Sequence, residues 1–444
     1  MLEILADRTY RHLFAAQITA LAGTGLATIA LGLLAYDLAG EDAAMVLGTV
    51  FTIKMAAYVG IAPIAGAFAD RLPRRALLVA LDIVRAASAL ALPFVSEIWQ
   101  LFVLIFVLQS ASAAFTPTFQ ATIPDVLPEE SRYTRALSLS RLAYDLENIF
   151  SPTLAALLLA IMSYDALFFG TVAGFLASAA LVVSVLLPSP TSSAPRGVYD
   201  RTTRGIRIYL ATPRLRGLLA LNLAAAAAGA MVLVNSVVLV RDGLGLGESA
   251  VAWTMGAFGG GSMLAALTLP RLLDRAPERA VMLTSAALMI ASLCALAALI
   301  PAVGFSWPLL LGAWATVGLG YSGILTPSGR LLRRSSNPED RPALFAAQFA
   351  LSHACWLVTY PLSGWLMTAY GALAALTGLS ALAFFGAVLA LLLWPNPDPV
   401  AIPHRHDDLP PHHLHLHGKH EHVHPYMIDD LHRRWPPANP RSPD

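Results

Sequence analysis

The sequence predicts an all-α membrane protein with twelve transmembrane helices arranged as two pseudo-symmetric halves of six helices each. Composition gives the first indication, because 57% of the 444 residues are hydrophobic and only 13% are charged. Soluble globular chains carry about 25% charged residues, so a water-soluble fold of this length could not bury so much apolar surface. The net charge of +1 also argues against a nucleic-acid partner, which would require a concentrated basic surface.

The apolar runs match the thickness of a lipid bilayer. A hydrocarbon core of roughly 30 Å requires about 20 apolar residues per helix. Twelve runs meet this length, near residues 13–36, 46–69, 76–95, 99–121, 138–162, 166–187, 215–240, 250–270, 280–300, 308–326, 344–367 and 371–394. The first run does not follow the residue order of a cleaved signal peptide, so we expect it to be retained as a helix.

Loop charges predict the orientation. Short cytoplasmic loops keep Arg and Lys, and here the arginines follow the even-numbered spans, as do Arg71, Arg74 and Arg75 after the second. Odd-numbered connections carry acids instead, such as Glu41 and Asp42. We therefore expect a multi-pass protein of the plasma (inner) membrane with both termini in the cytoplasm.

Similar loop motifs in the two halves indicate a parallel duplication. Asp70-Arg71 after the second span recurs as Asp274-Arg275 after the eighth, 204 positions later. Thr116-Pro117 likewise recurs as Thr326-Pro327, 210 positions later. Transporters with such repeats bind substrate between the halves near mid-membrane. The predicted divisions are an N-terminal half (1–188), a cytoplasmic linker (189–214), a C-terminal half (215–396) and a His-rich tail (397–444).

The loop after the second span, Gly66-Ala-Phe-Ala-Asp70-Arg71-Leu-Pro-Arg74-Arg75, resembles the signature loop of the major facilitator superfamily. The resemblance covers residues 1 to about 396. It implies that Gly66, Asp70 and the three arginines act as a conformational latch against the other half. The alternative is that the arginines only determine topology.

Two further charges in the third span extend this resemblance. Asp82 and Arg85, at positions i and i+3, are similar to a pair in the branch that contains siderophore, macrolide and metal exporters. We include them in the predicted latch. Pro73 stands where the superfamily usually has glycine, so we expect a stiffer turn there.

The energy source is expected to be an ion gradient. A phosphate-binding loop needs Gly-Lys-Ser/Thr, and the only lysines, Lys54 and Lys419, do not provide it. ATP hydrolysis within the chain is excluded on this ground, and an enzymatic activity is not expected. The superfamily resemblance implies protons as the coupling ion. We expect a monomer in the lipid bilayer.

Polar side chains inside the spans are the candidate transport pathway, because a charge at the bilayer centre costs roughly 2.5–3.5 kcal/mol. In the fifth span Arg141, Asp145 and Asn148 share one helical stripe, while Glu147 points away from it. The predicted pathway residues are Arg141, Asp145, Glu147, Asn148, His353 and Cys355. An Asp145–Arg141 ion pair without a transport role remains an alternative, as does a structural role for His353. Lys54 is a further intramembrane charge whose partner the sequence does not identify.

The tail concentrates histidine. Ten of the twelve histidines occur in the last 41 residues, and closely spaced imidazoles ligate Ni, Co, Zn and Cu. We expect the tail to be disordered when free. The predicted metal ligands are His404, His406, His412, His413, His415, His417, His420, His422 and His424. A tail that only responds to pH or solvates the chain is the alternative.

Together these features resemble nickel-resistance exporters, for which cobalt is a frequent second ion. The resemblance implies export of a divalent metal (Ni, with Co or Zn as further candidates) by proton antiport, with no tightly bound cofactor. One alternative is a siderophore or hydrophobic-drug exporter with a metal-sensing tail. Another is a membrane-anchored metal buffer or sensor.

Overall fold

The structure is a computed structural model. It describes the whole chain except residues 1, 69–72, 130, 131, 133–135, 137, 138, 141, 142, 144–146, 148–150, 152, 153, 189–197, 338, 339, 400, 406–420, 430, 433 and 437–444.

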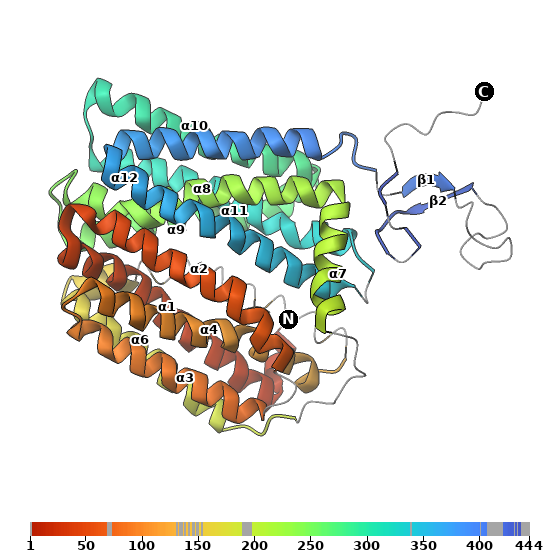
Figure 1. Ribbon diagram of the computed structural model, residues 1–444, viewed down its shortest axis with the longest axis horizontal. Coiled ribbons are helices and arrows are strands. Elements are labelled where there is room, and N and C mark those ends of the chain that lie inside the picture. Colours follow the sequence, from red (N-terminus) through yellow and green to blue (C-terminus); the bar gives the residue numbers. More distant parts are fainter. Residues whose placement is uncertain are drawn as a thin grey trace.

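Long apolar helices form two side-by-side groups (Figure 1). The first group contains α1 (Arg8–Ala39), α2 (Ala43–Phe68), α3 (Arg74–Ala91), α4 (Ile98–Val126) and α6 (Tyr164–Val183). The second contains α8 (Pro213–Arg241), α9 (Glu248–Leu273), α10 (Glu278–Val303), α11 (Trp307–Arg334) and α12 (Arg341–Leu393). Short 3-10 turns, η1 (Leu2–Ala6), η2 (Gly40–Asp42) and η3 (Leu92–Phe94), begin or connect the helices of the first group.

The predicted helical membrane architecture is confirmed. Within the described residues, nine stretches are long and apolar enough to cross a membrane. Two of them contain two helices each: Arg8–Ile61 includes α1 and most of α2, and Ala343–Leu393 is broken at Gly371, where φ is 81°. The predicted fifth span, 138–162, falls partly outside the described residues.

The two groups meet along a seam between α2 and α12. Glycines permit this close approach: a Cβ on Gly48 would lie 2.8 Å from the Tyr360 carbonyl oxygen, and one on Gly364 would lie 2.5 Å from that of Ala44. The Phe51 and Tyr360 rings pack across the same seam with centroids 4.9 Å apart. The two halves are therefore closely packed along this seam, and α8 of the second group also contacts α1 and α2 of the first.

The linker between the halves contains a helix, α7 (Val198–Ala211), which packs against the start of α12. Arg204 Nε lies 2.5 Å from Asp340 Oδ1, and the Tyr209 hydroxyl donates to Gln348 Oε1 at 2.5 Å. A Cβ on Gly205 would lie 2.0 Å from the Ala343 carbonyl oxygen. The second part of the predicted linker is thus fixed to the C-terminal half.

Part of the tail is folded, which corrects the expectation of disorder for these segments. Strands β1 (Ala401–Arg405) and β2 (Glu421–Pro425) pair antiparallel, with Ile402 opposite His424. Figure 1 shows this hairpin beyond the end of the helical bundle where α7 lies. Apolar side chains explain the order, since Tyr426 and Ile428 are buried in the main hydrophobic core and Ile402 and Trp435 pack against it.

Candidate metal centre and membrane pathway

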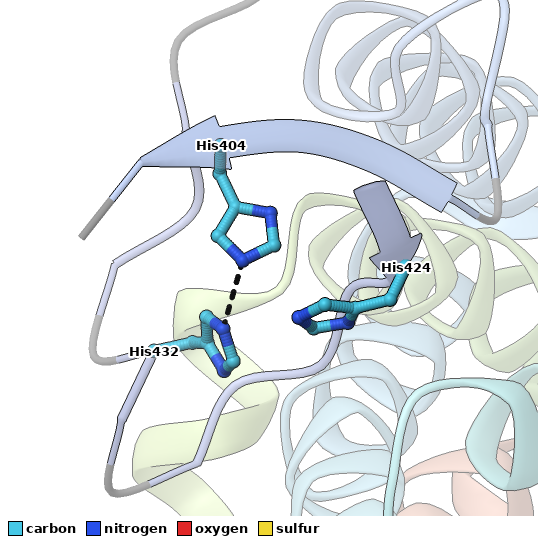
Figure 2. A group of neighbouring side chains, drawn as sticks. All are labelled: His404, His424 and His432. Atoms are coloured by element: carbon cyan, nitrogen blue, oxygen red, sulfur yellow. Dashed lines mark hydrogen bonds between the residues drawn. The ribbon is translucent and has the colours of Figure 1, made fainter. Parts of the chain in front are cut away.

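Three histidines of the tail converge on one point (Figure 2). His404 comes from β1, His424 from β2, and His432 from the segment that follows β2. One ring nitrogen from each lies within 4.8 Å of the others, and the Nε2 atoms of His404 and His432 are 3.1 Å apart. The structure therefore brings together two predicted ligands, His404 and His424, with a third that the predicted set omits.

The opposite ring nitrogens are all occupied by oxygen acceptors. His404 Nδ1 lies 2.9 Å from the Ile402 carbonyl oxygen, and His424 Nδ1 lies 2.8 Å from the Pro425 carbonyl oxygen. His432 Nδ1 lies 2.9 Å from Oδ1 of the Asp429 carboxylate. An oxygen without a proton can only accept, so each Nδ1 carries the hydrogen. In the neutral rings, Nε2 then bears the lone pair that binds a metal. Imidazoles that ligate metals characteristically donate their other N–H in this way.

Asp429 is the main organiser of this centre. Its Oδ1 accepts backbone N–H groups from Leu431 at 2.9 Å and His432 at 2.7 Å, in addition to the His432 ring. Burial raises the pKa of Asp429, but the hydrogen bonds from His432 and Leu431 outweigh burial and lower it to about 2. The carboxylate is therefore ionised at neutral pH. Its Oδ2 accepts from the Asn337 side chain at 3.4 Å, which connects the tail to the loop after α11.

The other predicted tail ligands cannot be placed. His406, His412, His413, His415, His417 and His420 lie outside the described residues, as does the side chain of His422. His422 contributes its backbone to β2, where it stands opposite His404. A metal-binding role for these seven histidines stays a prediction.

The membrane interior contains a second polar group, built around Lys54 on α2. The charges of Lys54 and Glu147 act on each other electrostatically, which makes Glu147 the candidate for the partner that the sequence left unidentified. A Cβ on Gly25 would lie 2.9 Å from Glu147 Oε1, so the glycine leaves room for this carboxylate. A small cavity of about 20 Å³, bordered by Thr28 and Gln109, adjoins Lys54. Arg141, Asp145 and Asn148 lie outside the described residues.

His353 faces the N-terminal half across the seam. Its ring stacks on Tyr58 of α2 with centroids 5.3 Å apart and planes 4° from parallel, and it also packs on Phe349 at 3.9 Å. Its Nδ1 lies 2.7 Å from the Phe349 carbonyl oxygen, and the charge of Lys54 acts on it. Cys355 instead directs its sulfur toward backbone oxygens of Leu351 at 3.5 Å and Leu219 at 4.0 Å. The structure thus brings His353, but not Cys355, toward the Lys54–Glu147 group.

Comparison with known proteins identifies the family. Sequence features of the Major Facilitator Superfamily match residues 13–245 and 218–420. The chain belongs to this superfamily. It is therefore a multi-pass membrane transporter, as the helices and the duplicated loop motifs also indicate.

Individual relatives match over shorter lengths. The MFS-type transporter YfiS of Bacillus subtilis (strain 168) is 26% identical over 213 residues, which are 46% of this chain and 50% of the relative. Macrolide efflux protein A of Streptococcus pyogenes is 27% identical over 150 residues, 33% of this chain and 37% of the relative. The matched part of the chain therefore spans half of these curated relatives or less.

Solved structures agree on the fold of this major facilitator. The nucleoside transporter NupG superposes with a TM-score of 0.66 at 13% identity, covering 87% of this chain and 98% of NupG. A bacterial homologue of the human lysosomal transporter Spinster, in an inward-facing unoccupied state, gives 0.65 at 13% identity, covering 87% and 95%. At this identity the similarity establishes the fold alone.

The superfamily's signature loop is only partly described. Gly66 is described by its backbone in α2, and Asp70 and Arg71 lie outside the described residues. Arg74 pairs with Asp125 of α4, and Arg75 donates to the Val183 carbonyl oxygen of α6. Both of these contacts are within the N-terminal half. The latch remains a prediction.

The Asp82–Arg85 pair is also internal to the N-terminal half. The two side chains are buried and bonded to each other, and Asp82 additionally accepts from the Ser178 hydroxyl at 2.8 Å. The Arg85 guanidinium lies 4.0 Å from the Phe115 ring and 4.5 Å from the Phe175 ring. These contacts join α3, α4 and α6, which favours a structural role for the pair.

Proposed function

We propose that this transporter exports divalent transition-metal cations from the cytoplasm, with nickel as the leading candidate and cobalt or zinc as further ones. The carrying observation is the His404–His424–His432 centre, whose three Nε2 atoms have the donor type and the second-layer hydrogen bonds typical of metal ligands. Nickel itself is selected by the resemblance to nickel-resistance exporters.

The position of the centre supports export rather than uptake. The tail is anchored through Asp398, which pairs with Arg334 at the end of α11. This end of the bundle carries the arginine-rich connections, and such connections remain in the cytoplasm. A metal collected there is offered to the pathway from the cytoplasmic side, in the plasma (inner) membrane.

Protons are the proposed coupling ion. The Glu147–Lys54 group supplies a carboxylate in the membrane interior, and His353 lies across the seam from it. Such intramembrane charges are characteristic of proton relays. Alternate protonation of Glu147 would change the balance of charge beside Lys54 and so favour one arrangement of the two halves over the other.

Reconstituted vesicles test this function directly. We expect purified protein to move Ni²⁺ out of loaded proteoliposomes when a proton gradient is imposed, and Ni²⁺ addition to release protons. Glu147→Gln should abolish the exchange, whereas His432→Ala should only raise the metal concentration at half-maximal rate. Absence of transport for nickel, cobalt and zinc alike would refute the proposal. Metal binding without any transport would support a membrane-anchored buffer instead.

A second candidate is efflux of a hydrophobic drug or siderophore, favoured by the similarity to macrolide efflux protein A. In that case the tail senses metal and the aromatic surface formed by Tyr58, Phe349 and His353 contacts the substrate. Cells that lack the transporter would then accumulate macrolide or siderophore while keeping a normal metal content. Normal drug accumulation together with raised nickel would exclude this alternative.

A further inference from the structure

We propose that a first-row transition-metal ion, bound by the Nε2 atoms of His404, His424 and His432, fastens the tail to the loop between α11 and α12 and, through that loop, to the linker helix α7. The ion is then a regulatory ligand of the transporter. This role goes beyond the proposed export and does not require that the bound metal be the cargo.

The electrostatics of the centre favour a cation. With Nδ1 protonated in all three rings, two Nε2 lone pairs approach each other to 3.1 Å between His404 and His432. This arrangement is repulsive between neutral imidazoles unless a cation or an added proton lies between them. Tetrahedral coordination with metal–nitrogen bonds of 2.0–2.1 Å separates ligand nitrogens by about 3.3 Å, close to the observed spacing.

The third ligand needs only a small adjustment. The nitrogens of the group all lie within 4.8 Å of one another, so His424 has to approach the other two rings by at most about 1.5 Å to reach tetrahedral spacing. His404 and His424 project from adjacent strands, with ring centroids 4.6 Å apart. Three imidazoles leave one coordination position for water or an exchangeable ligand, which suits a site that responds to metal availability.

A continuous series of hydrogen bonds leads from the centre to the linker helix. Asp429 bonds the His432 ring through Oδ1 and the Asn337 amide through Oδ2. The Asn337 carbonyl accepts the backbone N–H of Asp340 at 3.1 Å. Asp340 then pairs with Arg204 of α7 at 2.5 Å. Fixing His432 with a metal therefore restrains Asp429, then the loop before α12, and finally the helix that joins the two halves.

Metal-independent contacts hold the base of the tail. The Arg214 guanidinium lies 4.9 Å from the Trp435 ring, and Asp398 pairs with Arg334 and lies 3.5 Å from Arg214. The tail is thus docked on the C-terminal half in any case. Metal binding therefore does not have to bring a distant segment to the bundle. It only has to fix the β1–β2 hairpin relative to the α11–α12 loop and α7. A small free energy of coupling is sufficient for that change.

The expected consequence is control of transport rate by metal occupancy. The first part of α12 forms the seam with α2, and α7 connects the halves in sequence. A restrained loop at the start of α12 biases the equilibrium between arrangements of the halves, which is the physical basis of coupling between distant sites.

Distances measured in the full-length protein test the coupling. One spin label on exposed Leu210 of α7 and one on exposed Val423 of β2 report the position of the tail relative to the linker, after Cys294 and Cys355 are replaced by serine. We expect Ni²⁺ or Zn²⁺ to narrow the Leu210–Val423 distance distribution in nanodiscs, with one ion bound per chain at the lowest concentrations.

Three variants separate the steps. His432→Ala should weaken the first metal-binding event at least tenfold and remove the narrowing, although it keeps the nine other tail histidines. Asn337→Ala should lower the metal affinity only by the small coupling factor, because linkage is reciprocal, and should lose the narrowing. His12→Ala, at the opposite end of the chain, should match the unaltered protein in both measurements.

Two results would overturn the inference: narrowing that survives His432→Ala, which would assign metal binding to the remaining histidines, or metal binding in the unaltered protein without any change in distance. Neither measurement involves transport. Failure of nickel, cobalt and zinc export in vesicles would therefore refute the proposed function and leave the coupling intact. Loss of the coupling in a protein that still exports metal would refute only the inference.

Discussion

Replacing Asp82 by asparagine tests whether the charged pair of α3 maintains the N-terminal half. The carboxylate is fully buried, pairs with Arg85 and accepts the Ser178 hydroxyl. Asp82→Asn leaves the Arg85 cation without its counter-charge, and breaking a buried ion pair in this way costs about 3–5 kcal/mol. Ser178→Ala removes one hydrogen bond and should cost only about 1 kcal/mol. We therefore expect the first substitution to be several times more destabilising than the second.

Reversible unfolding in mixed micelles, followed by tryptophan fluorescence as the fraction of dodecyl sulfate rises, measures these free energies. The double variant Asp82→Leu/Arg85→Leu removes both charges and should recover most of the loss, because well-packed apolar residues replace buried ion pairs at little cost. If Asp82→Asn unfolds within about 1 kcal/mol of the unaltered protein but no longer transports, the pair acts in the transport cycle and the structural interpretation is wrong.

Three further predictions address the seam, the metal centre and the pathway. Gly364→Ala should destabilise the α2–α12 contact by about 1–3 kcal/mol through overpacking. Gly60→Ala is the control, because a Cβ on Gly60 of α2 would lie in open space, and it should have no such effect. Equal unfolding curves for the two variants would contradict this prediction. Asp429→Asn should weaken metal binding about 10–100-fold by calorimetric titration, and an unchanged affinity would show that the carboxylate does not orient His432. Lys54→Met should destabilise the folded protein by roughly 2.5–3.5 kcal/mol because it leaves Glu147 as a lone intramembrane charge. Adding Glu147→Gln should restore the free energy of unfolding. A double variant no more stable than Lys54→Met would disprove the interaction between the two charges.

Sequence reasoning succeeded where the physical signal is local. The length of apolar runs fixes helices that must cross a bilayer, because every backbone group has to be satisfied inside the segment. The closely spaced tail histidines predict metal ligands, and His404 and His424 lie close together in the structure, while their binding of a metal stays a prediction. His432 could not be found this way, since it reaches the centre only after the chain turns at Asp429 and folds back.

Inside the membrane the sequence predicts how deep a residue lies along its helix better than it predicts which neighbouring helix its side chain faces. His353 and Cys355 occupy nearly the same depth of α12, but residues two apart on a helix point to different faces, and only His353 reaches the seam with α2. For the same reason the charge of Lys54 could be recognised but not its partner. Long-range packing determines which face of a helix contacts which neighbouring helix. Patterns in a single sequence do not contain this information.

The attachment of α7 has a consequence for dissecting the chain. Arg204 pairs with Asp340, directly before α12, and Gly205 and Tyr209 contact α12 itself. We therefore expect the boundary between independently expressible fragments to lie before Val198 and not at the centre of the connector. A split gene that leaves α7 on the second fragment should reassemble in the membrane. One that assigns α7 to the first fragment should expose the start of α12 and yield an incomplete C-terminal half.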